Sequence, residues 1–507
     1  MASKTDNSTR NVIPDWKQFD KSFKSGELNG DNPKHKDIFF YPIDEYINAW
    51  KQEKNIAVAG DLISAAIMNG NTKNQNVKDA AVFVIERKDQ CPSSLIDIAN
   101  EFIPSNLTEK EKTTKNTTEK IEQILNKKNS YKAAINYFRG LIRKYPYNPI
   151  WYVELSRCFI NLGLIEKATQ AMEIALHLGH DSRFITRAAS RLYLHIGDID
   201  KAHHILTQNP AIKYDPWILA SEIAVNSSRG RNSRFIKTGI NMIQSDSFSP
   251  FSLTELSSAI GTKELETSKK KGKLFIEHSL IAPNDNSLAQ ADWLMNYDRS
   301  LSLNFKHFEK PMFNYESNAR FAFMNDDYLC ALNNAIDWIG IMPFARTPIN
   351  FAADMAYTFL ENYSDAIKIL QIGLQANPND ASFLNNLAYA YALNNETDQA
   401  DLTLKKLNAT GINENEIAIC ATATNGLNEY RKGNINEGRK LYKIAIDKAK
   451  NNGNTNLAHK AMLNIIREEA YLTHSLKPEM QQIFDHLNTG NNQETEAMKK
   501  TIKKLLQ

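Results

Sequence analysis

An alanine recurs every 34 residues in two parts of the chain, at Ala134, Ala168 and Ala202 and again at Ala366 and Ala400. Small and apolar residues recur around each of these alanines at the same offsets. Self-similarity at a fixed period of this length is typical of stacked helical hairpins, each of which buries its apolar face against its neighbours. The period therefore predicts an all-α solenoid, and it explains how 507 residues fold without one large globular core.

Residues at equivalent positions of successive units are similar in size and polarity. Two units that start near residues 150 and 184 match at four positions: Ser156 with Ser190, Phe159 with Tyr193, Gly163 with Gly197, and Ala168 with Ala202. This pattern resembles the tetratricopeptide repeat family. The resemblance implies a right-handed superhelical solenoid of stacked antiparallel helix pairs, which acts as a scaffold or adaptor for protein binding.

The repeat pattern varies along the chain, and this variation predicts the domain organisation. Residues 104–120 contain almost no apolar side chains, as a linker does. The predicted parts are a polar flexible arm (1–36), degenerate helical hairpins (37–103), the polar linker (104–120), repeats (121–283), an irregular connector (284–315), repeats with a C-terminal cap (316–486), and a polar tail with a short basic helix (487–507).

The composition is that of an ordinary globular protein, with 42% hydrophobic residues, 23% charged residues and a net charge of +3. A net charge this small predicts no global attraction to nucleic acid. No apolar run approaches the roughly 18 residues that cross a bilayer, and the polar N-terminal stretch lacks the apolar region of a signal peptide. We therefore expect a cytoplasmic protein that does not enter a membrane.

Motifs for catalysis are absent from the sequence, which contains no GxxxxGK[ST] phosphate loop, no HExxH and no GxSxG. The four cysteines lie far apart in the chain. Cys158 and Cys330 fall in apolar helical stretches, where a buried and unreactive thiol is the common state. We therefore expect a non-catalytic protein without a cofactor.

Histidines gather in two successive repeats, with His177 and His180 three residues apart and His203–His204 in the next unit. A zinc or nickel site is one interpretation of this cluster. About one hairpin separates the two sets, however, and this separation favours surface histidines and no metal. The adjacent carboxylates Glu468–Glu469 point to different helix faces, and we expect both in solvent.

The resemblance implies that the first helix of each hairpin lines the concave face of the solenoid. At the family's spacing this face carries Arg157 in one unit and Phe184, Arg187 and Arg191 in the next. Arg187 and Arg191 are four residues apart, so they lie on one helix face. Arginine binds a carboxylate through two parallel hydrogen bonds, so the predicted ligand is a carboxylate-bearing segment of a partner protein or peptide.

Equivalent positions in the second half hold Phe351, Met355, Asn385 and Tyr389. Aromatic residues, Met and Asn suit an adaptable groove for a helix or an extended peptide. Core packing is the alternative interpretation for Phe351 and Met355.

Other functions remain open at this point. The arginines of the first half would serve structure alone if they paired with Glu154 or Glu166 along the stack. A regulatory subunit that restrains or recruits a separately encoded enzyme would have the same repeats. An RNA- or DNA-binding solenoid would use local basic residues, and it is the less favoured class because stacking aromatics are few. The candidate nucleic-acid-binding residues are Arg229, Arg231, Arg234, Lys237, Lys270 and Lys271.

Overall fold

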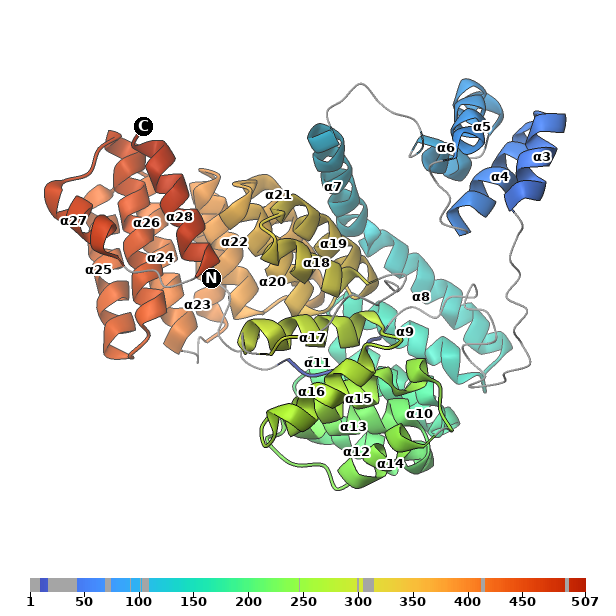
Figure 1. Ribbon diagram of the computed structural model, residues 1–507. Coiled ribbons are helices and arrows are strands. Elements are labelled where there is room, and N and C mark those ends of the chain that lie inside the picture. The colour runs from blue at the N-terminus through green and yellow to red at the C-terminus, as the bar shows by residue number, and fades with distance from the viewer. Residues whose placement is uncertain are drawn as a thin grey trace. The chain divides into compact units, whose positions relative to one another are not determined.

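The computed structural model describes residues 10–16, 43–68, 74–91, 93–100, 102, 109–245, 247–298, 301–303, 314–411, 415–487 and 492–507. Over these ranges the regular secondary structure is helical throughout, and no strand occurs (Figure 1). The all-α repeat fold predicted from the 34-residue period is confirmed. The chain divides into two compact units: residues 20–115 form one, and residues 1–19 together with 116–507 form the other.

The unit of residues 20–115 has a hydrophobic core of its own, in which the Trp50 ring meets Phe83 edge-on at a centroid distance of 5.3 Å. Consecutive helices of this unit pack against each other, as the predicted hairpins require. Its described elements are α3 (Ile43–Gln52), α4 (Ile56–Met68), α5 (Gln75–Glu86), the 3-10 turn η1 (Lys88–Gln90) and α6 (Ser93–Asn100).

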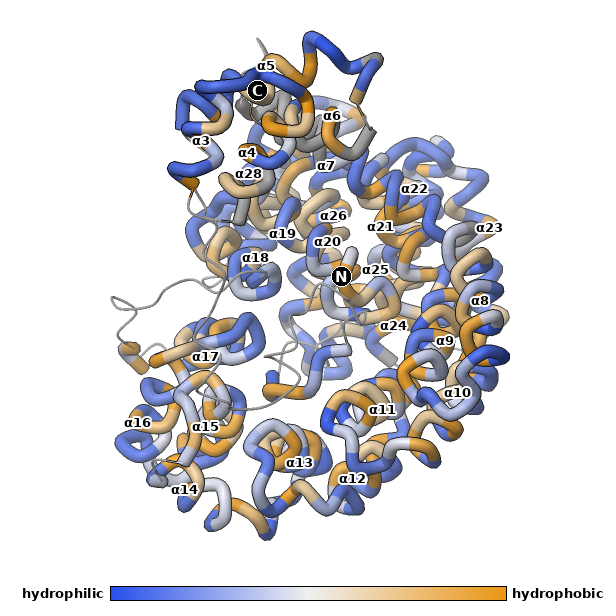
Figure 2. The backbone as a smooth tube through the Cα atoms, turned by 90° about the vertical axis from the view of Figure 1, so that its right-hand side faces the viewer, coloured by the Kyte–Doolittle hydropathy of each residue, from blue (hydrophilic) through white to orange (hydrophobic). Residues whose placement is uncertain are grey.

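The larger unit begins its regular helices with a series that we call the first array, α8–α17. Its helices follow one another along a curved row (Figure 2). The bounds are α8 (Lys127–Lys144), α9 (Pro149–Asn161), α10 (Ile165–Gly179), α11 (Arg183–His195), α12 (Ile199–Gln208), η2 (Pro210–Lys213), α13 (Pro216–Ser228), α14 (Ile236–Gln244), α15 (Pro250–Glu264), α16 (Lys269–Ser279) and α17 (Asp285–Tyr297).

A second array, α18–α26, follows in the same unit and ends in α27 and α28. Helix α20 continues into a π-helical turn, η3. The bounds are α18 (Tyr315–Met324), α19 (Tyr328–Ile341), α20 (Arg346–Asp354), η3 (Met355–Phe359), α21 (Tyr363–Ala376), α22 (Ala381–Leu393), α23 (Thr397–Ala409), α24 (Asn415–Arg431), α25 (Ile435–Asn451), α26 (Thr455–Thr473), α27 (Pro478–His486) and α28 (Gln493–Leu505).

The periodic alanines lie where the two helices of a hairpin meet. Ala168, Ala202, Ala366 and Ala400 each have no exposed surface. Because protein interiors are closely packed, a larger side chain at these fully buried positions would require movement of its neighbours. The structure therefore supports the steric reason for the period.

Turns between paired helices use the left-handed backbone region. Gly163 ends the turn after α9 with φ 71°, and a Cβ atom there would lie 3.0 Å from Pro378 Cδ. The equivalent turn of the second array has Asn395 at φ 61°. Asn tolerates this conformation better than most residues, so the turn survives there without glycine.

Several predicted boundaries are wrong. Helix α7 (Glu109–Leu125) runs through the predicted linker 104–120, and α17 occupies most of the described part of the predicted connector 284–315. Within the predicted arm 1–36, residues 10–16 are largely buried. By contrast, the tail 487–507 was predicted to contain a short basic helix, and α28 lies there and packs on α26.

Tertiary contacts explain the structure of the polar stretch around α7. Thr118 Oγ1 donates to Asp365 at 2.9 Å, and Lys120 Nζ lies 2.9 Å from Asp337. Ile121 and Ile124 are buried in the core of the second array. Because its partners lie more than 200 residues away, composition alone could not predict that this stretch is anchored.

The buried alanines provide a test of the repeat register. Ala168→Leu and Ala400→Leu should each lower the free energy of unfolding by about 1–3 kcal/mol, because extra methyl groups overpack the contact between paired helices. Ala133→Leu, on the exposed face of α8, is the matched control and should change stability little. Urea unfolding followed by circular dichroism measures all three. Unchanged stability of both buried variants would contradict the register.

Candidate peptide-binding site

Residues 10–16, which we call the N-terminal segment, lie against the first array. The segment has no regular secondary structure, and Val12 and Trp16 have no exposed surface. Val12 joins the core formed by α11–α15. Trp16 joins the core of α8–α11, where its ring lies 5.6 Å from that of Phe344 in the second array. The segment therefore contacts elements that are far apart in the sequence.

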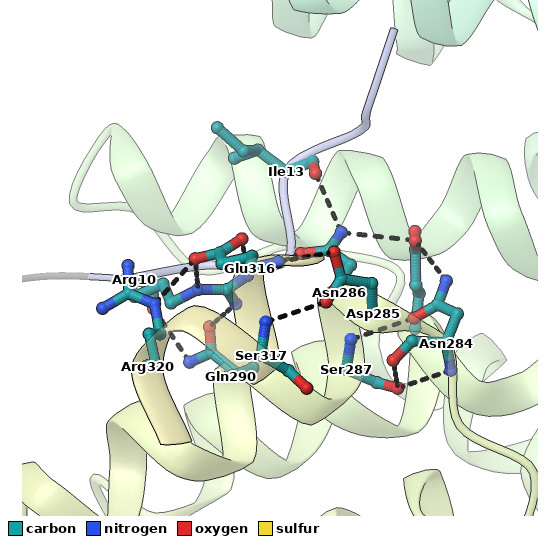
Figure 3. Close-up of polar contacts among 11 residues, drawn as sticks. Arg10, Ile13, Asn284, Asp285, Asn286, Ser287, Gln290, Glu316, Ser317 and Arg320 are labelled. Atoms are coloured by element: carbon teal, nitrogen blue, oxygen red, sulfur yellow. Dashed lines mark hydrogen bonds and ion pairs between the residues drawn. The ribbon is translucent and has the colours of Figure 1, made fainter. Parts of the chain in front are cut away.

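Arg10 forms the most extensive polar contacts of the segment (Figure 3). Its guanidinium group donates to both carboxylate oxygens of Glu316, from Nε at 2.9 Å and from Nη2 at 2.8 Å. Nη1 donates to Gln290 Oε1 at 2.8 Å, and Nη2 also donates to Asn286 Oδ1 at 3.0 Å. This fork-to-fork geometry is specific for a planar guanidinium group.

The backbone of the segment is held by side-chain amides of α17. Gln290 Nε2 donates to the Arg10 carbonyl oxygen at 2.9 Å, and Asn286 Nδ2 donates to the Ile13 carbonyl oxygen at 2.9 Å. These hydrogen bonds do not depend on which side chain the bound residue carries. Asn286 and Gln290 are four residues apart, so one face of α17 presents both amides.

The electrostatics of this site favour a bound cation. Burial by itself raises the pKa of the Glu316 carboxyl, but the charges and hydrogen bonds of Arg10 and Arg320 outweigh burial and lower it to about 2. Burial, with a further contribution from the Glu316 charge, raises the pKa of Asp285 to about 7. Burial also raises the pKa of Asp292 to about 7, against the opposing charges of Arg320 and Arg10.

Local capping orients α17 and α18 at the site. Asn284 and Ser287 form a reciprocal capping box at the start of α17. Asp285 accepts hydrogen bonds from the backbone amides of Glu316 and Ser317 at 3.1 and 2.9 Å, and so binds the N-terminal end of α18 (Figure 3). These contacts fix Glu316 opposite Gln290 and Asn286.

Arg187 is connected to the same network through its ion pair. Its Nη2 lies 2.8 Å from Glu255 Oε2, and Glu255 Oε1 accepts a hydrogen bond from Asn286 at 3.2 Å. Arg187 Nη1 donates to the Trp217 carbonyl oxygen and to Ser221 Oγ. The carboxylate opposite Arg187 thus comes from the chain itself, and Arg187 positions the residue that holds Asn286.

The other predicted residues of the first half have different surroundings. Arg157 is buried and pairs with Glu154 at 3.2 Å, as in the structural alternative. Phe184 is partly buried against the core of α8–α11. Arg191 is partly exposed, and its charge adds to burial in lowering the pKa of His195 to about 3. Binding of a carboxylate by these residues stays a prediction.

The predicted residues of the second half also take several roles. Met355 is 2% exposed and packs in the core rather than on a binding surface. Phe351 is partly buried, with its ring edge-on to Phe323. Asn385 and Tyr389 line a small pocket, and Tyr389 Oη donates to Asn464 Oδ1 at 2.9 Å. Their contact with a partner stays a prediction.

The adjacent carboxylates expected in solvent are buried instead. Glu468 and Glu469 are 1% and 4% exposed. Glu468 pairs with Arg431 and Arg467, and Glu469 pairs with Arg439 at 2.6 Å. The expectation failed because each glutamate pairs with an arginine of a neighbouring helix, and Glu468 also pairs with Arg467 of its own helix; such partners allow a buried charge.

The basic residues proposed for nucleic acid do not form one uniform patch. Arg229 is held by Asp200 at 2.6 Å. The remaining residues lie exposed on the turn before α14 and on α14 and α16: Arg231, Arg234, Lys237, Lys270 and Lys271.

The cysteine thiols and the histidines lie in several different environments. Burial raises the pKa of Cys158 to about 11. Cys330 is exposed in the first turn of α19, contrary to the expectation that it is buried. His203 Nε2 lies 3.1 Å from Glu222. In the described part of the chain, no group of three His, Cys, Asp or Glu side chains is arranged to hold a metal, and no helix is long and apolar enough to cross a membrane.

Sequence reasoning missed Arg10, Asn286, Gln290 and Glu316. A signal was nevertheless present, because Val12, Ile13 and Trp16 lie close together in an arm that is mostly polar. Apolar residues in such an arm are expected to find a protein surface. The partners on α17 and α18 carried no comparable signal, since Asn and Gln are ordinary surface residues.

Residues 355–402 match the family model of the Tetratricopeptide repeat. The matched residues form η3, α21, α22 and the start of α23. This stretch of the second array therefore has the sequence of a tetratricopeptide repeat, within a fold that is all-helical over the described residues. A comparison with curated proteins found no match.

Two solved structures resemble this repeat protein at low identity. One is a crystal structure of yeast Tom70, with 14% identity, a TM-score of 0.27, and coverage of 78% of this chain and 96% of that chain. The other is a structure of Naa15/Naa10 bound to HypK-THB, with 12% identity, a TM-score of 0.21, and coverage of 89% and 79%. At TM-scores this low we draw no conclusion from either likeness.

The ion pair of Arg187 with Glu255 is testable within the first array. Arg187→Ala should destabilise the chain by about 3 kcal/mol, because it leaves the buried Glu255 carboxylate without its cation. Adding Glu255→Gln should restore part of that loss. Arg183→Ala, on the same helix but in a pair that is 39% exposed at the arginine, should cost about 1 kcal/mol or less. Equal losses for the two arginines, measured by urea unfolding, would refute this assignment.

The buried acids predict a pH dependence of stability. The pKa of Asp292 is about 7 in the folded chain and about 3.9 when unfolded, so the folded state binds the proton more tightly. Stability should therefore fall as the pH rises from 5 to 8, and Asp292→Asn should reduce this fall by about 2 kcal/mol. Melting temperatures across this range provide the measurement. An identical pH dependence in the variant would contradict the raised pKa.

Proposed function

We propose that this chain is a non-catalytic scaffold that holds a peptide segment of a partner protein on a surface formed by α13, α17 and α18. The N-terminal segment is the observation that supports this proposal, because it is an irregular stretch of the chain's own residues held at this surface by backbone and side-chain contacts. We call the residues that contact it the docking surface. It includes Ser228 of α13, Asn286 and Gln290 of α17, and Glu316 of α18.

The docking surface combines general and specific contacts. Amide side chains of α17 hold two backbone carbonyl groups of the segment, which favours any peptide in this conformation. Arg10 lies in a polar site, and Val12 and Trp16 lie in two different apolar cores. These side-chain contacts select which peptide sequences bind. A preformed array with fixed side chains loses little conformational entropy when it binds a peptide. These properties suit an adaptor better than an enzyme.

A regulatory subunit is the second candidate. The occupation of the docking surface by the chain's own residues supports it, because a site that is filled in the isolated protein allows binding to be controlled. A cytoplasmic location accompanies both candidates as part of the proposal. Binding of RNA or DNA through the exposed residues of α14 and α16 stays a prediction.

Selection of displayed random peptides tests the scaffold function. The target is the full-length chain carrying Arg10→Ala and Trp16→Ala, which weakens the hold of the segment. Selected peptides should bind this target and should lose at least tenfold in affinity when Asn286→Ala and Gln290→Ala are added, because both backbone contacts disappear. Lys270→Ala with Lys271→Ala is the control on an exposed face of the same array.

Each result of this selection tests a different part of the proposal. Failure to enrich any peptide would refute the scaffold function, provided that circular dichroism shows a folded target. Enriched peptides that bind regardless of Asn286 and Gln290 would refute the assignment of the docking surface. Loss of binding in the control variant alone would favour the exposed face of α16 instead.

A further inference from the structure

We propose that the docking surface recognises a partner segment with an arginine, an aliphatic residue two positions later and a large aromatic residue six positions later, and that residues 10–16 compete with this segment in the isolated chain. The inference rests on the proposed function and adds the chemistry of the ligand and the regulation of the site. Arg10, Val12 and Trp16 show the spacing.

The arginine is required by the charge of its surroundings. Arg10 and Glu316 side chains are only 10% and 12% exposed, and Arg320 Nε is the other charged donor to Glu316, at 2.9 Å. Asp285 and Asp292 lie near the same carboxylate and add negative charge when ionised. Without Arg10, the Glu316 carboxylate keeps only Arg320 as a charged partner. A ligand that brings a positive charge to this carboxylate is therefore favoured.

The planar fork selects arginine over lysine. Arg10 donates four hydrogen bonds to four oxygen atoms on three side chains, those of Glu316, Gln290 and Asn286. A lysine ammonium group has three donors at one point and cannot satisfy Glu316 in a bidentate manner. Gln290 and Asn286 would then each lose a donor.

The segment is held to its site only by noncovalent contacts. Residues 1–19 belong to the same compact unit as residues 116–507, but the chain between them forms the other unit. The segment therefore behaves as a tethered ligand, whose occupancy depends on the effective concentration that this long connection allows. A partner segment with the same anchors competes directly with it.

The aromatic anchor of the segment is not fully matched to its surroundings. Trp16 is fully buried, yet its indole Nε1 has no hydrogen-bond partner among the described residues. A buried donor without an acceptor weakens binding. A phenyl ring would contact the same apolar residues without this donor, so a partner with phenylalanine at this position displaces the segment more readily.

A labelled peptide of residues 7–19 tests the inference on the full-length chain. Fluorescence anisotropy should show at least tenfold tighter binding to the Arg10→Ala, Trp16→Ala chain than to the wild-type chain, because the competing segment is weakened. Arg143→Ala, an exposed arginine of α8, is the control and should bind as the wild type does. We call a chain in which the N-terminal segment no longer competes fully an open form, and the wild-type chain the closed form. A second open form keeps Arg10 and Trp16 but carries a protease site inserted between residues 30 and 31, at which the chain is cut after folding.

Peptide variants then test each anchor. Arg10→Ala and Trp16→Ala peptides should lose at least tenfold in affinity, Arg10→Lys should lose severalfold, and Trp16→Phe should bind as tightly as the parent peptide or more tightly. Glu316→Gln in the open chain should weaken the parent peptide strongly and the Arg10→Ala peptide little, because the two residues act as a pair.

Three results would overturn the inference. Equal affinity of the peptide for the wild-type chain and for the two open forms would refute competition between the N-terminal segment and the peptide. Binding that ignores Arg10 and Trp16 would refute the anchors. No binding of this peptide to either open form would refute the inference as a whole. In each case the proposed function still stands if random peptides bind through Asn286 and Gln290, so the two failures are distinguishable.

Discussion

Close contact between paired helices at small residues is the constraint on which both arrays depend. A chain without a sheet buries its apolar surface only where helix meets helix. Ala168 and Ala366 have no exposed surface, and a Cβ atom on Gly179 or Gly373 would lie within 2.8 Å of a neighbouring isoleucine or phenylalanine side chain. These contacts set the distance between successive hairpins, and that distance in turn places the first helices side by side.

Helices α15 and α18 carry acidic residues into the protein interior. Because these residues are buried, each needs a partner of opposite charge. Glu255 and Glu316 are both carboxylates with little exposed surface. Arg187 of α11, two hairpins earlier in the chain, neutralises the first, while Arg320 and Arg10 neutralise the second. Arg10 comes from a position 306 residues away. The buried carboxylate of Glu316 is therefore paired in part by a residue from a distant segment of the same chain.

The second array resolves the same problem with its own helices. Glu468 and Glu469 are neutralised by arginines of α24, α25 and α26. Lys460 of α26 pairs with Glu494 of α28, so the C-terminal helix also contributes a buried charge. Both ends of the chain thus complete polar surfaces that the repeats leave open. The difference is that α28 is a regular helix packed on α26, whereas the N-terminal segment has no regular structure.

The sequence by itself determined the helical repeats, because period and residue size are local properties that each hairpin repeats. It also indicated that Arg187 lies on the first helix of its hairpin. Arg187 does join the network of the docking surface, through its ion pair with Glu255. Only the tertiary structure decided that Arg10 meets Glu316, that α7 is anchored, and that Glu468 is buried. Each of these features depends on contacts between segments far apart in the chain. Such contacts follow from how hairpins stack and curve in space, and neither the period nor the composition of a segment encodes which distant residue it will meet.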